Sequence, residues 1–190
     1  MTQYPVGPYL GKIQAGFGGV VILCIDVSGS MSGSPLESAV QGAKKFAEEA
    51  ILAHYEVGVT LWNHSIAASI EPKRELSPVI RFLGGATSCG GTDINDALQA
   101  AHDLLRGRSA EIDRVVAIFG DGDLGDRDRA IVKAAAMRAD DIRILTLGLG
   151  RESARALEEI STEVNEQPRT ATVNTIAAEI AHLANGLRRR

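Results

Sequence analysis

The sequence predicts one α/β domain with a doubly wound, mostly parallel central sheet, one short antiparallel edge strand and helices on both faces. Two observations lead to this prediction. The runs Val20 to Ile25 and Val115 to Phe119 are continuously apolar, which is typical of parallel strands covered on both faces. Such runs alternate with helical patterns along the chain, as in βαβ units. The length of 190 residues suits a single domain, which buries roughly 70% of its unfolded surface.

The first half of the domain is expected to contain three strands and a long helix. After the strand at residues 20–25, the segment Ser34-Pro35-Leu36-Glu37 has the form of a capping box with proline at the first helical position, which predicts a helix start. Alternation over residues 57–61 predicts a second strand, and residues 63–65 form a turn into the short edge strand at 66–70. The sheet-facing side of the helix is formed by Leu36, Ala39, Val40, Ala43, Phe46 and Ala47.

The second half repeats the alternation of helices and strands. Ser77-Pro78 predicts a short helical turn that ends at Phe82, and a longer helix follows Thr92. Its apolar face consists of Ile94, Ala97, Leu98, Ala101, Leu104 and Leu105. The remaining predicted elements are a helix to about Arg138, a strand at 142–147, a helix at 153–160, an edge strand at 170–173 and a last helix capped by Asn174.

The predicted domain occupies residues 20–187. Residues 1–19 contain five glycines and two prolines, a composition that predicts an N-terminal arm rather than a packed element. Residues 188–190 are three arginines, which we interpret as a solvated basic tail because no aromatic residues accompany them.

Three loops, each at the end of a predicted strand or in a strand-end position, contain oxygen ligands. They are Asp26-Val27-Ser28-Gly29-Ser30, Gly90-Gly91-Thr92-Asp93 and Phe119-Gly120-Asp121-Gly122. The carboxyl ends of parallel strands meet at one edge of the sheet, where open α/β folds bind ligands. The two carboxylates and three hydroxyls are hard oxygen ligands of the kind that Mg²⁺ prefers. The predicted metal ligands are Asp26, Ser28, Ser30, Thr92 and Asp121.

Several residues in and near these loops also have a local structural interpretation. Asp26 is expected to accept backbone N–H groups from the turn that follows it, which is compatible with metal binding. Asp93 or Thr92 is a candidate helix N-cap. We interpret Asp123, Asp126 and Asp128 as charges that favour a helix start and keep the rim of the site acidic.

The order and spacing of these residues resemble the von Willebrand factor A domain family. The family pattern of a metal-ion-dependent adhesion site is D-x-S-x-S, then a Thr, then an Asp at a later strand end, and this sequence contains all five positions. The resemblance covers roughly residues 18–187 and implies a Rossmann-like fold. It also implies that the serines and the threonine approach the metal directly, while Asp26 and Asp121 often act through waters. Gly120 departs from the pattern, since many relatives have Thr or Ser there, and we expect looser surroundings for Asp121.

The resemblance further implies a function. We expect the domain to bind Mg²⁺, with Mn²⁺ or Ca²⁺ as alternatives, and to bind an Asp or Glu carboxylate of a partner protein through the cation. Intracellular members of the family often work beside an ATPase or an assembly component, which implies a regulatory or assembly role. Stand-alone domains of the tellurium-resistance-associated type are one such group.

Composition predicts a cytoplasmic protein that binds neither nucleic acid nor membranes. No signal peptide or membrane span is recognisable in the sequence, and the two cysteines are too few for a disulfide framework. Cys24 is expected in the core, and Cys89 in a loop beside the site. The net charge of −4 disfavours nucleic acid.

Other functions have weaker support. Gly120-x-Gly122-x-x-Gly125 matches the dinucleotide fingerprint by letter, but the aspartates of that loop would repel a pyrophosphate. No G-x-S-x-G segment is present, and no Cys or His pair has zinc-ligand spacing. We therefore expect that the protein is not an enzyme. The alternative is a metal-assisted phosphoryl hydrolase that uses Asp121 and Asp123.

Overall fold

The computed structural model describes residues 18–163, 168–172 and 174–187. Within these residues one six-stranded sheet has the strand order β3-β2-β1-β4-β5-β6. The strands are β1 (Gly19–Asp26), β2 (Glu56–Trp62), β3 (Ile66–Lys73), β4 (Asp113–Gly120), β5 (Arg143–Leu149) and β6 (Thr170–Ala171). β3 pairs with β2 in antiparallel orientation at one edge, and the other pairs are parallel. The predicted doubly wound α/β fold, including its antiparallel edge strand, is confirmed.

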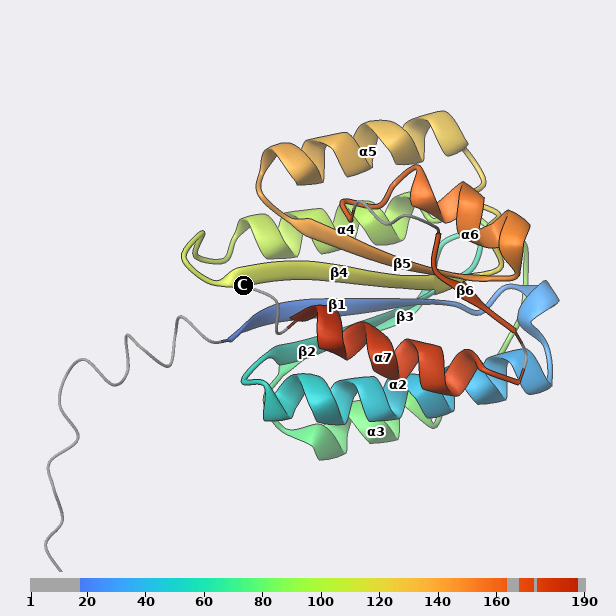
Figure 1. Cartoon of the computed structure of the whole chain (residues 1–190), viewed down its shortest axis with the longest axis horizontal. Helices are drawn as coiled ribbons and strands as arrows, with labels where there is room; N and C mark the ends of the chain where they lie inside the picture. Colours follow the sequence, from blue (N-terminus) through green and yellow to red (C-terminus); the bar gives the residue numbers. More distant parts are fainter. Residues whose placement is uncertain (1–17, 164–167, 173, 188–190) are drawn as a thin grey trace, which may run out of the picture.

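Helices cover both faces of the sheet. They are α2 (Ser34–Leu52), α3 (Leu76–Leu83), α4 (Asn95–Arg106), α5 (Arg127–Ala139), α6 (Arg151–Glu158) and α7 (Ile176–Leu187), and a 3-10 turn, η1 (Gly29–Met31), follows β1. Figure 1 shows α2, α3 and α7 on one side of the sheet and α4, α5 and α6 on the other. No helix in the described part of the chain is long and apolar enough to cross a membrane.

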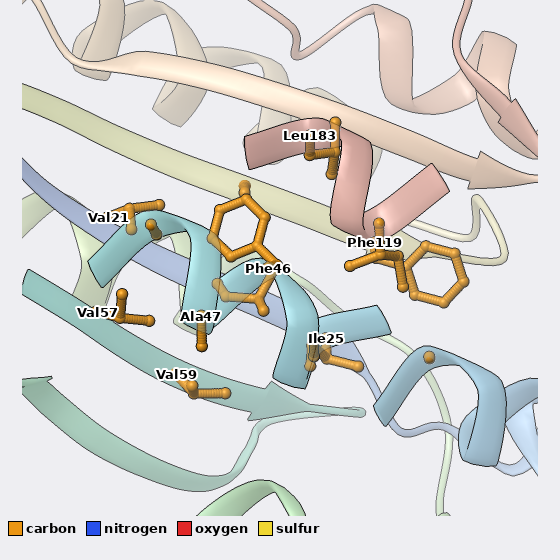
Figure 2. Close-up of a cluster of buried hydrophobic side chains, with 14 of the residues drawn as sticks. Val21, Ile25, Phe46, Ala47, Val57, Val59, Phe119 and Leu183 are labelled. Atoms are coloured by element: carbon orange, nitrogen blue, oxygen red, sulfur yellow. The ribbon is translucent and has the colours of Figure 1, made fainter. Parts of the chain in front are cut away.

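The two layers of helices give two hydrophobic cores. All eight residues of β1 are buried, and its side chains alternate between the cores because successive residues of a strand point to opposite faces. Val21, Leu23 and Ile25 belong to the core under α2 and α7, where Figure 2 shows Phe46 of α2 near Leu183 of α7. Cys24 belongs to the other core and is fully buried, as expected.

Five helix starts differ from the prediction, and two of them are those of α3, which begins at Leu76 and not at Ser77, and of α6, which begins at Arg151 and not at Ser153. α2 begins at Ser34, and its N-cap is Gly33. The N-cap predicted from the capping box, Ser34, is therefore one residue too late. Gly33 has a φ of +80°, a conformation that glycine adopts without a steric penalty. α4 begins at Asn95 and its N-cap is Ile94. α7 begins at Ile176, two residues after Asn174. The local signals therefore located these helices but not their first residues.

The topology places the predicted site at the centre of one sheet edge. β1 lies between β2 and β4, and the chain leaves β1 through α2 on one face but reaches β4 through α4 on the other. In open α/β sheets, ligands bind at the carboxyl ends of the strands where such a reversal occurs. Asp26 is the last residue of β1, and Asp121 directly follows β4.

Candidate metal centre

Asp26 lies at the carboxyl end of β1 and is fully buried. One carboxylate oxygen, Oδ1, accepts the backbone N–H of Ser28 at 2.8 Å, so the predicted role of Asp26 in its own turn is confirmed. The other oxygen, Oδ2, accepts the N–H of Asp121 at 3.4 Å. The carboxylate of Asp26 thus joins the loops after β1 and β4.

Burial changes the acidity of Asp26. The pKa of Asp26 is raised from 3.8 to about 6, chiefly by desolvation and to a smaller extent by the nearby Asp121 carboxylate, while hydrogen bonds from Ser28 and from the Asp121 N–H act in the opposite direction. Within the described residues, neither Asp26 nor Asp121 forms an ion pair with a lysine or arginine. Ionisation of Asp26 is therefore costly here, and a cation bound beside it would lower that cost.

Hydrogen bonds connect the two serines to Asp121. The hydroxyls of Ser28 and Ser30 are 3.0 Å apart, and the Ser30 hydroxyl donates to Oδ2 of Asp121. Ser28 is buried, whereas Ser30 is exposed. Four of the five predicted ligands, Asp26, Ser28, Ser30 and Asp121, therefore form one connected oxygen cluster at the sheet edge.

Thr92, the fifth predicted ligand, lies half-buried in the loop between α3 and α4. Backbone hydrogen bonds attach this loop to the end of β1: Cys89 donates to Val27 at 2.9 Å, and Gly29 donates to Gly90 at 3.0 Å. In the part of the chain that the structure describes, the Thr92 hydroxyl has no hydrogen-bond partner. The structure thus brings the loop of Thr92 to the site, and among the described residues no hydrogen bond joins its hydroxyl to the other four side chains.

Asn63 is a buried residue that the sequence analysis treated only as part of a turn. Its side-chain amide donates to the carbonyl of Cys89 at 3.1 Å, and its own carbonyl accepts the N–H of Asp93 at 2.6 Å. Its side-chain oxygen also accepts the N–H of Ser65 at 3.1 Å. Asn63 therefore holds both ends of the segment that contains Thr92. The only sequence signal for this role is its place directly after β2.

No role was predicted from the sequence for Trp62, the last residue of β2. It pairs in register with Asp26 and is fully buried. A Cβ atom at Gly120, on the opposite side of Asp26, would lie 3.3 Å from Cζ2 of the indole and 3.2 Å from Oδ2 of Asp26. A side chain at position 120 would therefore be crowded by both Trp62 and Asp26.

Ser153, near the start of α6, is a third residue that was not predicted to take part. Its hydroxyl contacts the carbonyl oxygens of Asp121 and Leu149, the latter at 2.6 Å. The expectation that Gly120 leaves loose surroundings around Asp121 is not supported, because Ser153, Asp26 and Ser30 all contact Asp121.

The rest of the loop between β4 and α5 is organised by its own aspartates. Asp123 accepts the N–H of Gly125 at 2.9 Å, and Asp126 is the N-cap of α5, where it accepts the N–H of Arg129 at 3.2 Å. Gly122 and Gly125 have positive φ values, and their backbones face Ser153 and Asp93 closely. The glycines thus serve contacts within the protein, unlike the glycines of a dinucleotide fingerprint, which approach a pyrophosphate.

The donor set fits magnesium better than zinc. Among the described residues, no group of three or more His, Cys, Asp or Glu side chains is placed to hold a metal ion. Cys89 is exposed beside the site, but thiolates are ligands for softer metals. The cluster instead offers two carboxylates and neutral hydroxyls, which suits a hard divalent cation.

The comparison with known proteins defines the class of this domain. Residues 21–123, more than half of the chain, match the family model described as von Willebrand factor type A domain. The chain belongs to the von Willebrand factor A domain family. No curated protein matches the sequence.

Solved structures of low sequence identity have the same fold. The von Willebrand factor domain of the type V pili tip protein Mfa5 from Porphyromonas gingivalis is 13% identical, with a TM-score of 0.77 over 92% of this chain and 97% of that chain. The conserved hypothetical protein BatB from Bacteroides thetaiotaomicron is 18% identical, with a TM-score of 0.70 over 88% of this chain and 100% of that chain.

The pilus adhesin SpaC from Lactobacillus rhamnosus GG is 12% identical, with a TM-score of 0.74 over 90% of this chain. The match spans only 30% of that adhesin. At these identities the neighbours support the fold and not a shared ligand.

Proposed function

We propose that this domain is a metal-dependent protein-interaction module, which binds Mg²⁺ at the carboxyl edge of the sheet and, through it, a carboxylate of a partner protein. Domains of the von Willebrand factor A family are protein-interaction modules, and the similar structures include a pilus adhesin and a pilus tip protein. The observation that carries the proposal is the pair Asp26 and Asp121, two neighbouring carboxylates with no basic partner among the described residues.

Five residues would hold the cation. Ser28, Ser30 and Thr92 would supply neutral hydroxyl oxygens, and Asp26 and Asp121 would supply the two negative charges that balance a divalent ion. Because its remaining ligands are neutral, the ion would stay attractive to one more carboxylate. Mg²⁺ requires octahedral oxygen coordination, which leaves room for a ligand from outside the domain. The free Thr92 hydroxyl and the raised pKa of Asp26 both support a bound cation.

This proposal implies a regulatory or assembly role for the domain and not a catalytic role. Asp123, the second acid of the alternative hydrolase, accepts the N–H of Gly125 within its own loop. Among the described residues, no histidine forms a hydrogen bond with any of the five ligands. We therefore propose a non-enzymatic domain in the cytoplasm, with Mn²⁺ or Ca²⁺ as alternative cations.

Affinity capture from the native lysate tests this function. Wild type, Asp26→Ala and Thr92→Ala are each compared in Mg²⁺ and in chelator, and Glu48→Ala, an exposed acid in the C-terminal half of α2, is the matched control. We expect a partner that is retained by wild type and by the control only in Mg²⁺. Retention of the same proteins by all variants in both conditions would refute a metal-dependent interaction.

Magnesium-dependent turnover of a phosphate ester is the corresponding test for the alternative. A rate that is lost in Asp121→Asn but kept in Thr92→Ala would favour the hydrolase over the interaction module. We expect no rate above background for wild type.

A further inference from the structure

We infer that Ser153, which lies outside the residues matched by the family model, is a positioning residue that holds Asp121 in place for the cation. This inference rests on the proposed function, because it concerns one of the five proposed ligands. Ser153 lies near the start of α6. It therefore contacts the Asp121 loop from an element that contains none of the five proposed ligands.

The first support is the set of contacts that fix the Asp121 peptide. Its N–H donates to Asp26, and its carbonyl accepts the hydroxyl of Ser153. The side chain in turn accepts from Ser30. Asp121 is therefore held at three points, of which Ser153 provides the one on the far side from β1.

The second support is the close packing between α6 and this loop. Gly122 has a φ of +91°, and a Cβ atom there would lie 2.3 Å from Cα of Ser153. A Cβ atom at Gly148, on β5, would lie 2.2 Å from the backbone nitrogen of Ala154. The chain thus has glycine at two positions where α6 approaches, and this approach brings the Ser153 hydroxyl to the Asp121 carbonyl.

The third support is the anchor of Ser153 itself. The residue is only 9% exposed, and its hydroxyl oxygen also contacts the carbonyl of Leu149 at 2.6 Å. A serine hydroxyl has one proton, so the two carbonyls compete for it, and the hydroxyl is confined between the end of β5 and the Asp121 loop. Loss of an outer-shell group that hydrogen-bonds a metal ligand typically costs about 10- to 100-fold in metal affinity, and Ser153 acts in this way through the peptide of Asp121.

The test measures Mn²⁺ affinity from the electron paramagnetic resonance signal of the free ion. We expect Ser153→Ala to weaken Mn²⁺ binding by about 10-fold. Ser161→Ala is the matched control, because Ser161 is 8% exposed and bonds the carbonyl of Ile144 on the same strand, β5. It should change the affinity by less than about 2-fold. Ser153→Cys, which keeps a weak donor, replaces Ser153→Ala if that variant does not fold.

A double-mutant comparison separates positioning from general packing. If Ser153 acts through Asp121, the change Ser153→Ala has little further effect in an Asp121→Asn background that still binds Mn²⁺, less than about 2-fold. If Asp121→Asn binds no Mn²⁺, the comparison of Ser153→Ala with Ser161→Ala decides alone. The inference is overturned if Ser153→Ala binds Mn²⁺ like wild type, if it weakens binding no more than Ser161→Ala, or if its full effect persists without Asp121. If wild type itself binds no Mn²⁺, the proposed function fails first and the inference fails with it.

Discussion

Trp62 and Gly120 occupy complementary positions on either side of Asp26. Cζ2 of the indole lies 3.3 Å from the position that a Cβ at residue 120 would take, and that Cβ would also lie 3.2 Å from Oδ2 of Asp26. The indole is fully buried, and its Nε1 has no hydrogen-bond partner in the described part of the chain. Trp62 therefore covers one side of the Asp26 carboxylate, and the absence of a side chain at position 120 makes this possible.

The first prediction concerns this pair. Gly120→Thr should destabilise the protein by roughly 1–3 kcal/mol because the core at this point is already filled. Combination with Trp62→Phe should recover part of that loss, since the smaller ring vacates the position of Cζ2. Urea unfolding of the two single variants and the double variant measures the coupling. Strictly additive losses would contradict the proposed complementarity.

Cation binding should stabilise the folded protein. At a Mg²⁺ concentration about 100-fold above its dissociation constant, linkage predicts a gain of about 2.7 kcal/mol, or roughly 5–10 °C in the melting temperature of a domain of this size. Thermal unfolding with Mg²⁺ and with chelator measures the shift. Asp121→Asn should show a much smaller shift, and an equal shift in this variant would argue that the ion binds elsewhere.

The raised pKa of Asp26 predicts how stability depends on pH in the absence of metal. The folded-state value of about 6 lies above the value of about 3.9 for an unfolded Asp, so the folded state binds the proton more tightly. This contribution is fully present below about pH 4 and is lost as the pH rises through 6, by an amount on the order of 3 kcal/mol.

Chelator-treated wild type and Asp26→Asn are compared by urea unfolding between about pH 4 and 7 to measure this contribution. The free energy of unfolding of wild type should fall with rising pH relative to Asp26→Asn, which has no proton to lose. Saturating Mg²⁺ should reduce the difference because the ion favours the carboxylate. Parallel pH profiles for the two proteins would show that Asp26 has an ordinary pKa.

Gly122 provides a test of the contact between α6 and the Asp121 loop. Gly122 and Gly150 have nearly the same φ, +91° and +90°, but a Cβ at Gly150 would meet nothing within 4 Å. Gly150→Ala should therefore cost only the backbone strain of about 1–3 kcal/mol. Gly122→Ala should cost more and also weaken Mn²⁺ binding, because Ser153 must move away. Equal effects of the two substitutions on stability and on Mn²⁺ affinity would contradict this account.

The fold was largely predictable because its signals are local and strong. Continuous apolar runs such as Val20 to Ile25 identified the covered strands, and β1 is indeed buried along its whole length. The helix starts were less accurate, since Gly33 rather than Ser34 precedes α2. Capping depends on the backbone conformation of one residue, and several nearby residues can fill the role.

In the candidate site, only the proposed ligands could be predicted from the sequence, because their residue types are those of a metal site. Asp26, Ser28, Ser30 and Asp121 were all foreseen, and they form one cluster. Trp62, Asn63 and Ser153 were not, because each acts through its packing or hydrogen bonds with residues distant in sequence. Ser153 and Asp121 are 32 residues apart, and no short motif joins them. The supporting residues of a site become visible only when the tertiary structure is known.

The most direct test of the central claim is an anomalous difference map from crystals grown with Mn²⁺. The account predicts one strong peak coordinated by the hydroxyls of Ser28, Ser30 and Thr92, at distances near the 2.0–2.1 Å typical of Mg²⁺, with Asp26 and Asp121 beside it. Crystals of Asp121→Asn grown in the same way should show a weaker peak or none. A wild-type map without a peak at the ends of β1 and β4, at saturating Mn²⁺, would contradict the proposed metal centre.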